Sequence, residues 1–291
     1  MNREPPEPLS RHGAEMHAYE ARTQAMWDVR GWREMFAELI ESRELTWRLF
    51  RRDFSARFRQ NVGGILWAFV SPVILVGGVM LLRSSGMLNV GDLDAPYPVY
   101  AVLGLTVWLM FAGVVGGCTG ALAGAGDLVR RINFPREALV LSAAGHVLVD
   151  VLIRLVLFAF VLAWFRVVPC WTSIFLPLVV LPILLLGLAL GFILSALNAV
   201  VRDIGNAASI VLTYLVFLVP AMYPCPESGL LATLMKYNPL TPPVTASLDI
   251  VLRGTITEPL PFIAVSLGSL AAVLLAWRVF HMLEPLVAER V

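Results

Sequence analysis

The stretch VVPCWTSIFLPLVVLPILLLGLALGFILSALNAVV, Val167 to Val201, runs for 35 residues without a charged side chain. A helix needs roughly 20 apolar residues to cross the hydrocarbon core of a bilayer. The stretch therefore predicts a membrane-spanning helix, which we place at residues 174–200. The whole chain of 291 residues agrees, because only 15% of them are charged, against about 25% in soluble proteins. We predict an all-α membrane protein.

Five other apolar runs are also long enough to span a membrane. The sequence predicts these spans at residues 64–82, 100–123, 138–165, 207–223 and 262–280. Six spans in total place the two termini on the same side. Lysine and arginine side chains number 17 on that side and 4 on the other. The positive-inside rule then predicts that both termini are cytoplasmic.

Residues 1–62 precede the first predicted span and divide into two parts. Residues 1–31 are polar and rich in proline near their start, which predicts a flexible arm. Residues 32–62 carry aromatic side chains three or four positions apart, on one face of a predicted helix: Trp47, Phe50, Phe54 and Phe58. With arginines on its other faces, this is the pattern of an interfacial amphipathic helix in the headgroup plane. A helix packed on a soluble core is the alternative.

Residues 221–261, between the last two predicted spans, are rich in proline and only partly apolar. They are too polar to cross a membrane and too apolar to lie free in water. We predict short re-entrant helices that dip into the outer leaflet, where they must be buried in protein or line water. Residues 63–291 then form a single membrane domain.

The sequence lacks the motifs of common catalytic sites. A P-loop needs a lysine after its glycines, and the one lysine of the chain, Lys236, has no such setting. HExxH and GxSxG are also missing, and the four histidines are scattered. We expect no enzymatic activity, no metal and no cofactor in this chain. A net charge of +1 gives no reason to expect nucleic acid as a partner.

One polar stripe lies within a predicted span. His146, Asp150 and Arg154 are four residues apart and share a helix face. A lone charge at mid-membrane costs roughly 2.5 to 3.5 kcal/mol on insertion scales. An intramembrane pair of Asp150 and Arg154 offsets part of that cost. We favour this structural pair over a proton or ion relay, because no second intramembrane carboxylate is present to pass a proton onward.

Aromatic side chains recur in the first, second and fifth predicted spans. Those near the ends of a span match the interface belts of membrane proteins. Trp108 and Phe111 lie near mid-depth, where they are either stacking faces for sugar rings or ordinary core residues. The candidate channel residues are Trp67, Phe69, Trp108, Phe111, Tyr214 and Phe217.

The segment DLVRRINFPREALVLS, Asp127 to Ser142, is a charged island between two apolar runs. Its arginines either enforce topology or contact acidic groups of a partner. Phe134 can fill an apolar pocket, and Pro135 suits the first turn of a helix, with Asn133 or a neighbour as its cap. The residues alone do not decide between a topological role for these arginines and contact with a partner.

Four segments resemble the type-2 ABC transporter permeases that export polysaccharides. The segments are RRDFSARFRQNVGGILWAFVSPVILV at 51–76, GDLVRRINFPREALVLSA at 126–143, LGFILSALNAVVRDIGNAASIVLTYLVFLVPAMYP at 190–224 and YNPLTPPVTASLDIVLRG at 237–254. They follow one another in the order of that family. The family's basic entry helix, its F-P-R-E segment and its R-D turn are all present.

The resemblance implies a transmembrane subunit of the bacterial inner membrane that works as a homodimer with two copies of a separate ABC ATPase. ATP and Mg would bind to that partner. The island near 126–137 would be the coupling helix that docks on the ATPase through Asp127, Arg130, Arg131, Asn133, Phe134, Pro135, Arg136 and Glu137. Interfacial arginines would attract lipid headgroups or a diphosphate: Arg51, Arg52, Arg57 and Arg59.

The implied substrate is a lipid-linked polysaccharide such as an O-antigen, and the aromatic residues of the spans would let its sugars slide. Export of a capsular chain or a teichoic acid is a close alternative. A type-2 ABC permease for drugs or small lipids would share the same topology. A membrane-embedded transferase or scaffold is the alternative of another class, and it would need no ATPase partner.

Overall fold

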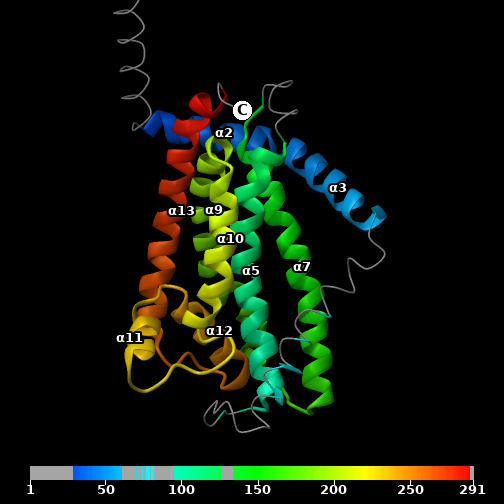
Figure 1. Ribbon diagram of the computed structural model, residues 1–291, viewed down its shortest axis with the longest axis vertical. Helices are drawn as coiled ribbons and strands as arrows, with labels where there is room; N and C mark the ends of the chain where they lie inside the picture. Colours follow the sequence, from blue (N-terminus) through cyan, green and yellow to red (C-terminus); the bar gives the residue numbers. More distant parts are fainter. Residues whose placement is uncertain are drawn as a thin grey trace, which may run out of the picture.

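A computed structural model describes residues 29–60, 95–125 and 134–288, with a few single residues between 70 and 93. Every regular element in these ranges is a helix (Figure 1). The all-α fold that the sequence predicts is therefore confirmed for the described part of the chain.

Four stretches are long and apolar enough to cross a membrane. Three are single helices: α5 (Tyr97–Gly124), α7 (Glu137–Trp164) and α13 (Pro259–Ala288). The fourth joins η1 (Trp171–Phe175), α8 (Leu176–Val179) and α9 (Leu181–Val200) into one apolar stretch. These stretches confirm long apolar helices at four of the predicted spans, 100–123, 138–165, 174–200 and 262–280. The predicted span at 64–82 lies largely outside the described residues.

The fifth predicted span, 207–223, has the wrong boundaries. The structure has α10 (Asp203–Leu215) followed by η2 (Val216–Leu218), a length of about 24 Å at 1.5 Å per residue. The helical run ends at Leu218 because Val219, which precedes Pro220, is extended with φ −130° and ψ 140°. A residue before proline disfavours the helical conformation. Residues 219–222 are instead buried as an irregular segment.

Helix α5 lies at the centre of the bundle and packs against α7, α9 and α12. Most of its residues from Tyr97 to Leu122 are buried, and the exposed ones are glycines in its second half. Gly104 allows the closest approach, because a Cβ at this position would lie 2.2 Å from the carbonyl oxygen of Ala221. The irregular segment after η2 can therefore lie directly on α5. The Tyr100 hydroxyl holds it there by donating to the Pro220 carbonyl oxygen at 3.0 Å.

The outer helices leave large apolar side chains uncovered. One row on α7 repeats every four residues and is exposed along most of the helix: Leu148, Leu152, Val156, Phe160 and Trp164. Exposed apolar residues on α13 include Leu260, Ile263, Leu267 and Leu270. Contiguous apolar surface of this extent is rare on soluble proteins, and it is what a helix facing lipid presents.

Short helices lie at the two ends of the bundle (Figure 1). At one end, α2 (Val29–Glu41) and α3 (Arg43–Gln60) lie beside the end of α13 and the start of α7. At the other end are α11 (Leu230–Tyr237) and α12 (Thr241–Leu252). We call these the α2 end and the α12 end.

The predicted amphipathic helix at 32–62 is helical as far as Gln60, the last described residue of that range, but it is not one helix. It is interrupted at Ser42, whose hydroxyl donates to the Leu39 carbonyl oxygen at 3.1 Å. The short helices expected within 221–261 are present as α11 and α12. Most of α12 is buried, and it packs against α5, α13 and α8.

Candidate functional site

The start of α7 is a turn that contacts α3. Phe134 is half-buried against a small apolar cluster made of Leu49, Ala138 and Leu139. The Pro135 carbonyl oxygen accepts a hydrogen bond from Ala138 N–H at 3.2 Å. Residues 134–136 are not helical, and α7 begins at Glu137, two positions after Pro135. Part of the Phe134 ring thus packs within the chain, and the rest is uncovered.

The other residues predicted to dock on an ATPase divide into two groups. Asp127, Arg130, Arg131 and Asn133 lie outside the described residues. Arg136 is half-buried at the N-terminal boundary of α7, and its side chain does not cap the helix.

Glu137 is buried and does not present its carboxylate on a docking surface, which corrects its predicted role. Its residue exposure is 3%. Glu137 Oε1 lies 2.8 Å from His281 Nδ1 on α13. Glu38 Oε2 of α2 lies 3.9 Å from the same nitrogen. This cluster joins the start of α7 to α13 and brings α2 alongside.

A buried arginine ties α2 to α13 at the same end. Arg278 is 1% exposed, and its Nη1 lies 2.8 Å from Met35 Sδ. Its guanidinium carbon lies 5.3 Å from the centre of the Trp32 ring, within cation–π range. Sequence reasoning missed this residue. Its position inside the apolar run at 262–280 could have indicated it, because a charged residue within a span has a partner or a function.

The first two of the predicted headgroup-binding arginines of α3 are exposed. These are Arg51 and Arg52, and Arg52 Nε lies 2.7 Å from Asp53 Oδ1. The side chains of Arg57 and Arg59 lie outside what the structure describes. Phe50 faces α7 instead, where its ring stacks on His146 with a centroid distance of 4.8 Å.

The polar stripe of α7 extends over about two turns of the helix. His146 stacks on Phe50, while Asp150 and Arg154 lie one and two turns further along the helix and are partly buried. Both charged residues take part in interactions. Their pairing with each other stays a prediction.

Among the described channel candidates, two aromatic rings are buried and two are exposed. Trp67 and Phe69 lie outside the described residues. Trp108 and Phe111 are 3% and 1% exposed in the core, with ring centres 5.6 Å apart. The prediction that these two rings offer faces to sugars is corrected, because neighbouring helices cover both. Tyr214 and Phe217, of α10 and η2, are exposed.

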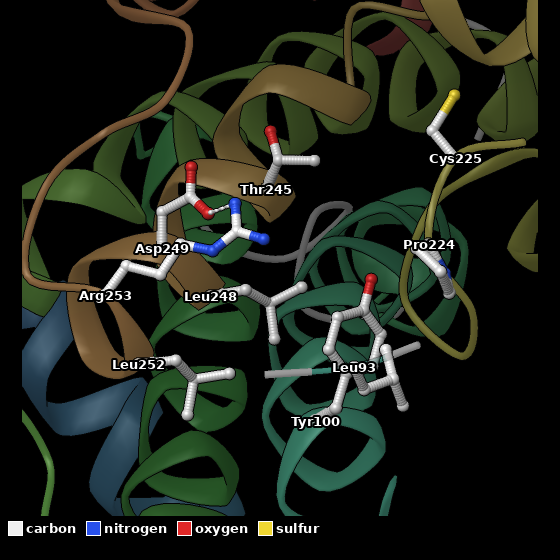
Figure 2. A pocket seen from close by; sticks show the side chains of 9 residues that line it. All are labelled: Leu93, Tyr100, Pro224, Cys225, Thr245, Leu248, Asp249, Leu252 and Arg253. Carbon is white, nitrogen blue, oxygen red and sulfur yellow. Dashed lines mark hydrogen bonds and ion pairs between the residues drawn. The ribbon is translucent and has the colours of Figure 1, made fainter. Parts of the chain in front are cut away.

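The α12 end holds a polar site that the sequence did not indicate. A cavity of about 130 Å³ lies between α12, Tyr100 of α5 and the Pro224–Cys225 segment. Figure 2 shows the side chains that line it. Arg253 Nη1 lies 3.1 Å from Asp249 Oδ1. The backbone N–H of Thr257 donates to Asp249 Oδ2 at 2.9 Å. Burial raises the pKa of the Cys225 thiol beside this cavity, and the charge of Glu258 adds to the shift.

Comparison with known proteins places these features in a family. A family model described as ABC-2 type transporter matches residues 44–252, a range that begins in α3 and ends with α12. The chain belongs to the ABC-2 type transporter family. Members are multi-pass membrane permeases without ATPase activity or a nucleotide site, and they work with ATPase subunits. The predicted family and the absence of ATPase activity are confirmed.

The chain is also similar to a curated protein, the O-antigen export system permease protein RfbA of Myxococcus xanthus. The two sequences are 28% identical over 251 residues. This alignment covers 85% of the present chain and 94% of the relative.

Proposed function

We propose that this ABC-2 permease exports a lipid-linked polysaccharide, such as an O-antigen, across the bacterial inner membrane. The observation that carries the proposal is the similarity to an O-antigen export permease along 94% of that protein. The active assembly is a homodimer of this chain with two copies of an ATPase subunit, which binds ATP and Mg. Both termini, and with them the α2 end, face the cytoplasm.

The turn at Phe134–Arg136 is the part of the described chain that receives force from the ATPase. It rests on α3 through the cluster of Leu49, Ala138 and Leu139. Glu137, the next residue, is bonded to His281 of α13. A displacement of the turn on ATP binding would therefore move α3, α7 and α13 together, as a switch between closed and open states requires.

The substrate path uses the residues of the predicted set other than the buried Trp108 and Phe111. Arg51, Arg52, Arg57 and Arg59 attract the diphosphate of the carrier lipid, with charge-assisted hydrogen bonds as the physical basis. Tyr214 and Phe217 offer uncovered rings to sugars, together with Trp67 and Phe69 of the predicted first span. Asp150 and Arg154 serve as a structural pair.

Disruption of the gene tests the function. We expect lipid-linked glycan to accumulate inside the cell and to disappear on complementation with the native chain. The kind of glycan that accumulates distinguishes O-antigen from a capsular chain or a teichoic acid. No accumulation, combined with ATPase stimulation by small amphiphiles, would favour a drug or small-lipid permease instead.

Pull-down of the tagged protein from membranes tests the coupling turn. We expect an ATPase subunit with the native chain and its loss with the double variant Phe134→Ala, Arg136→Ala. Because Phe134 also packs within the chain, Leu49→Ala is the matched control: it opens the same cluster while every residue of the turn stays unchanged, and it should retain the ATPase. Recovery of no ATPase with any chain would point to a transferase or scaffold.

A further inference from the structure

A large polar cavity lies at the α12 end of the described chain. It has a volume of about 720 Å³ and is lined by α11, α12, the segment 225–229 and the start of α13. The smaller cavity of Figure 2 adjoins it, since both are lined by Cys225, Thr245, Asp249 and Arg253. Sites for small molecules commonly measure about 300 to 1,000 Å³. The cavity is therefore large enough to hold a ligand.

Its lining combines groups of both charges with hydroxyls and one aromatic ring. The cations are Lys236 and Arg253, and the carboxylates are Glu227, Asp249 and Glu258. Hydroxyl groups come from Ser228, Thr233, Thr241, Thr245 and Thr257. The aromatic residue is Tyr237, which is 80% exposed at the end of α11. Hydrogen-bond donors and acceptors thus surround a single uncovered ring.

The polar groups at the base of the cavity are fixed in place. Asp249 is 8% exposed and uses one carboxylate oxygen for Arg253 and the other for the backbone of Thr257. Arg253 Nη1 also donates to Thr257 Oγ1 at 3.1 Å. Nearby, the buried Thr241 hydroxyl has no hydrogen-bond partner among the described residues. A buried hydroxyl without a partner costs free energy, and a ligand that bonds it would recover that cost.

The charge balance discriminates between classes of ligand. Three carboxylates against two cations disfavour a diphosphate or another polyanion. No cluster of metal-binding side chains is found among the described residues. An uncharged polyhydroxyl ligand suits the lining, because each hydroxyl can donate to a carboxylate and accept from a cation or threonine. The apolar face of a sugar ring can then lie on Tyr237.

We propose that this cavity binds sugar residues of the exported glycan on the side of the membrane opposite the ATPase. The inference rests on the proposed function and adds a substrate site to it. Sugars leaving the membrane helices would be held between α11 and α12, with the ring of Tyr237 against one face and the Asp249–Arg253 pair against their hydroxyls. Such a site would disfavour backward movement of the chain between cycles of ATP hydrolysis.

Binding of glycan without its lipid tests the site. The probe is the polysaccharide released from its carrier by mild acid, which carries neither diphosphate nor prenyl chain. The protein is the complete permease–ATPase complex in lipid nanodiscs, and saturation-transfer NMR gives the Kd. We expect Tyr237→Ala to raise the Kd by about ten-fold, because it removes the stacking face.

Two variants separate loss of the ring from general damage. Tyr237→Phe keeps the stacking face and should bind like the native chain. Leu230→Ala removes an exposed side chain from the same helix outside the cavity lining and should also bind like the native chain. The inference is overturned if the released glycan does not bind, or if Tyr237→Ala binds as tightly as Leu230→Ala. Competition by inorganic diphosphate would also overturn it and indicate a site for lipid headgroups.

Failure of the inference is distinguishable from failure of the proposed function. Gene disruption that causes no accumulation of lipid-linked glycan contradicts the function, whatever the cavity binds. If disruption does cause accumulation and Tyr237→Ala leaves glycan binding unchanged, the proposed function is supported. The inference that this cavity binds sugars is then contradicted.

Discussion

Glu137 and His281 lie 144 positions apart in the sequence and meet at 2.8 Å between Oε1 and Nδ1. Glu137 opens α7 directly after the turn proposed to contact the ATPase, and His281 is near the end of α13. This contact connects the two helices at the α2 end. It gives the proposed coupling turn a direct link to the last long helix of the chain.

Replacement of His281 by alanine tests this link. The change leaves a buried carboxylate without its partner, so we expect the free energy of unfolding to fall by about 1–3 kcal/mol. Thermal unfolding of the purified protein in detergent measures it as a lower Tm. Glu38→Ala is the control, because Glu38 is 3.9 Å from His281 and its side chain is 46% exposed. Equal Tm values for the two variants would argue against a stabilising role for the Glu137–His281 bond.

The long helices were predictable from the sequence, but their neighbours were not. A long apolar run with few charges identifies a transmembrane helix. Trp108 and Phe111 show the limit of this reasoning. A helix surrounded by other helices and a helix surrounded by lipid are both apolar on every side, so the pattern of α5 does not reveal which of the two it is. These two rings are buried because α7, α9 and α12 pack around α5. That arrangement depends on tertiary contacts, which the sequence pattern does not contain.

The predicted end of the fifth span, at residue 223, was wrong, although a local sequence rule gives the correct helix boundary. Pro220 marks the end of the helical run at Leu218, and the preference of the residue before proline for extended backbone predicts that boundary. The contacts of Glu137 and Arg278 are different. Each joins elements far apart in the sequence, so only the tertiary arrangement reveals that the first is bonded to His281 and the second to Met35.

Gly104 is required by the close contact between α5 and the segment after η2. In Gly104→Ala the new methyl group would lie 2.2 Å from the Ala221 carbonyl oxygen, and backbone must move to admit it. We expect a loss of about 1–3 kcal/mol or more, read as a lower Tm. Gly120→Ala on the same helix meets nothing within 4 Å and should gain up to about 1 kcal/mol of helix propensity. Similar Tm values for both variants would contradict the packing described.

Arg166 ends α7 in a left-handed conformation, with φ at 54°. Its N–H bonds to the Ala163 carbonyl oxygen at 3.2 Å, and Val167 N–H bonds to that of Leu162 at 3.0 Å. This is the Schellman arrangement, in which glycine is preferred. We expect Arg166→Gly to raise the stability by about 1 kcal/mol, because glycine removes the steric cost of positive φ. Arg166→Ala keeps that cost and should give no increase in Tm.

Cys225 reports which side of the membrane the α12 end faces. It is exposed, whereas Cys118 is fully buried and Cys170 is half-buried. A membrane-impermeant maleimide added to spheroplasts should label the native chain and leave Cys225→Ser unlabelled. Labelling only after the membrane is permeabilised would place the α12 end in the cytoplasm and reverse the proposed orientation.

The rate of that labelling should depend on pH in a defined direction. Partial burial of the Cys225 sulfur raises the pKa of its thiol, although the residue as a whole is exposed, and the negative charge of Glu258 raises that pKa further. Since the thiolate is the reactive form, labelling at neutral pH should be slower than for an unhindered cysteine and should accelerate as the pH rises toward the thiol pKa. Glu258→Gln removes one of the two causes, lowers that pKa and should speed the reaction at neutral pH. An unchanged rate in Glu258→Gln would show that the carboxylate does not act on the thiol, and burial alone would then account for the slow reaction.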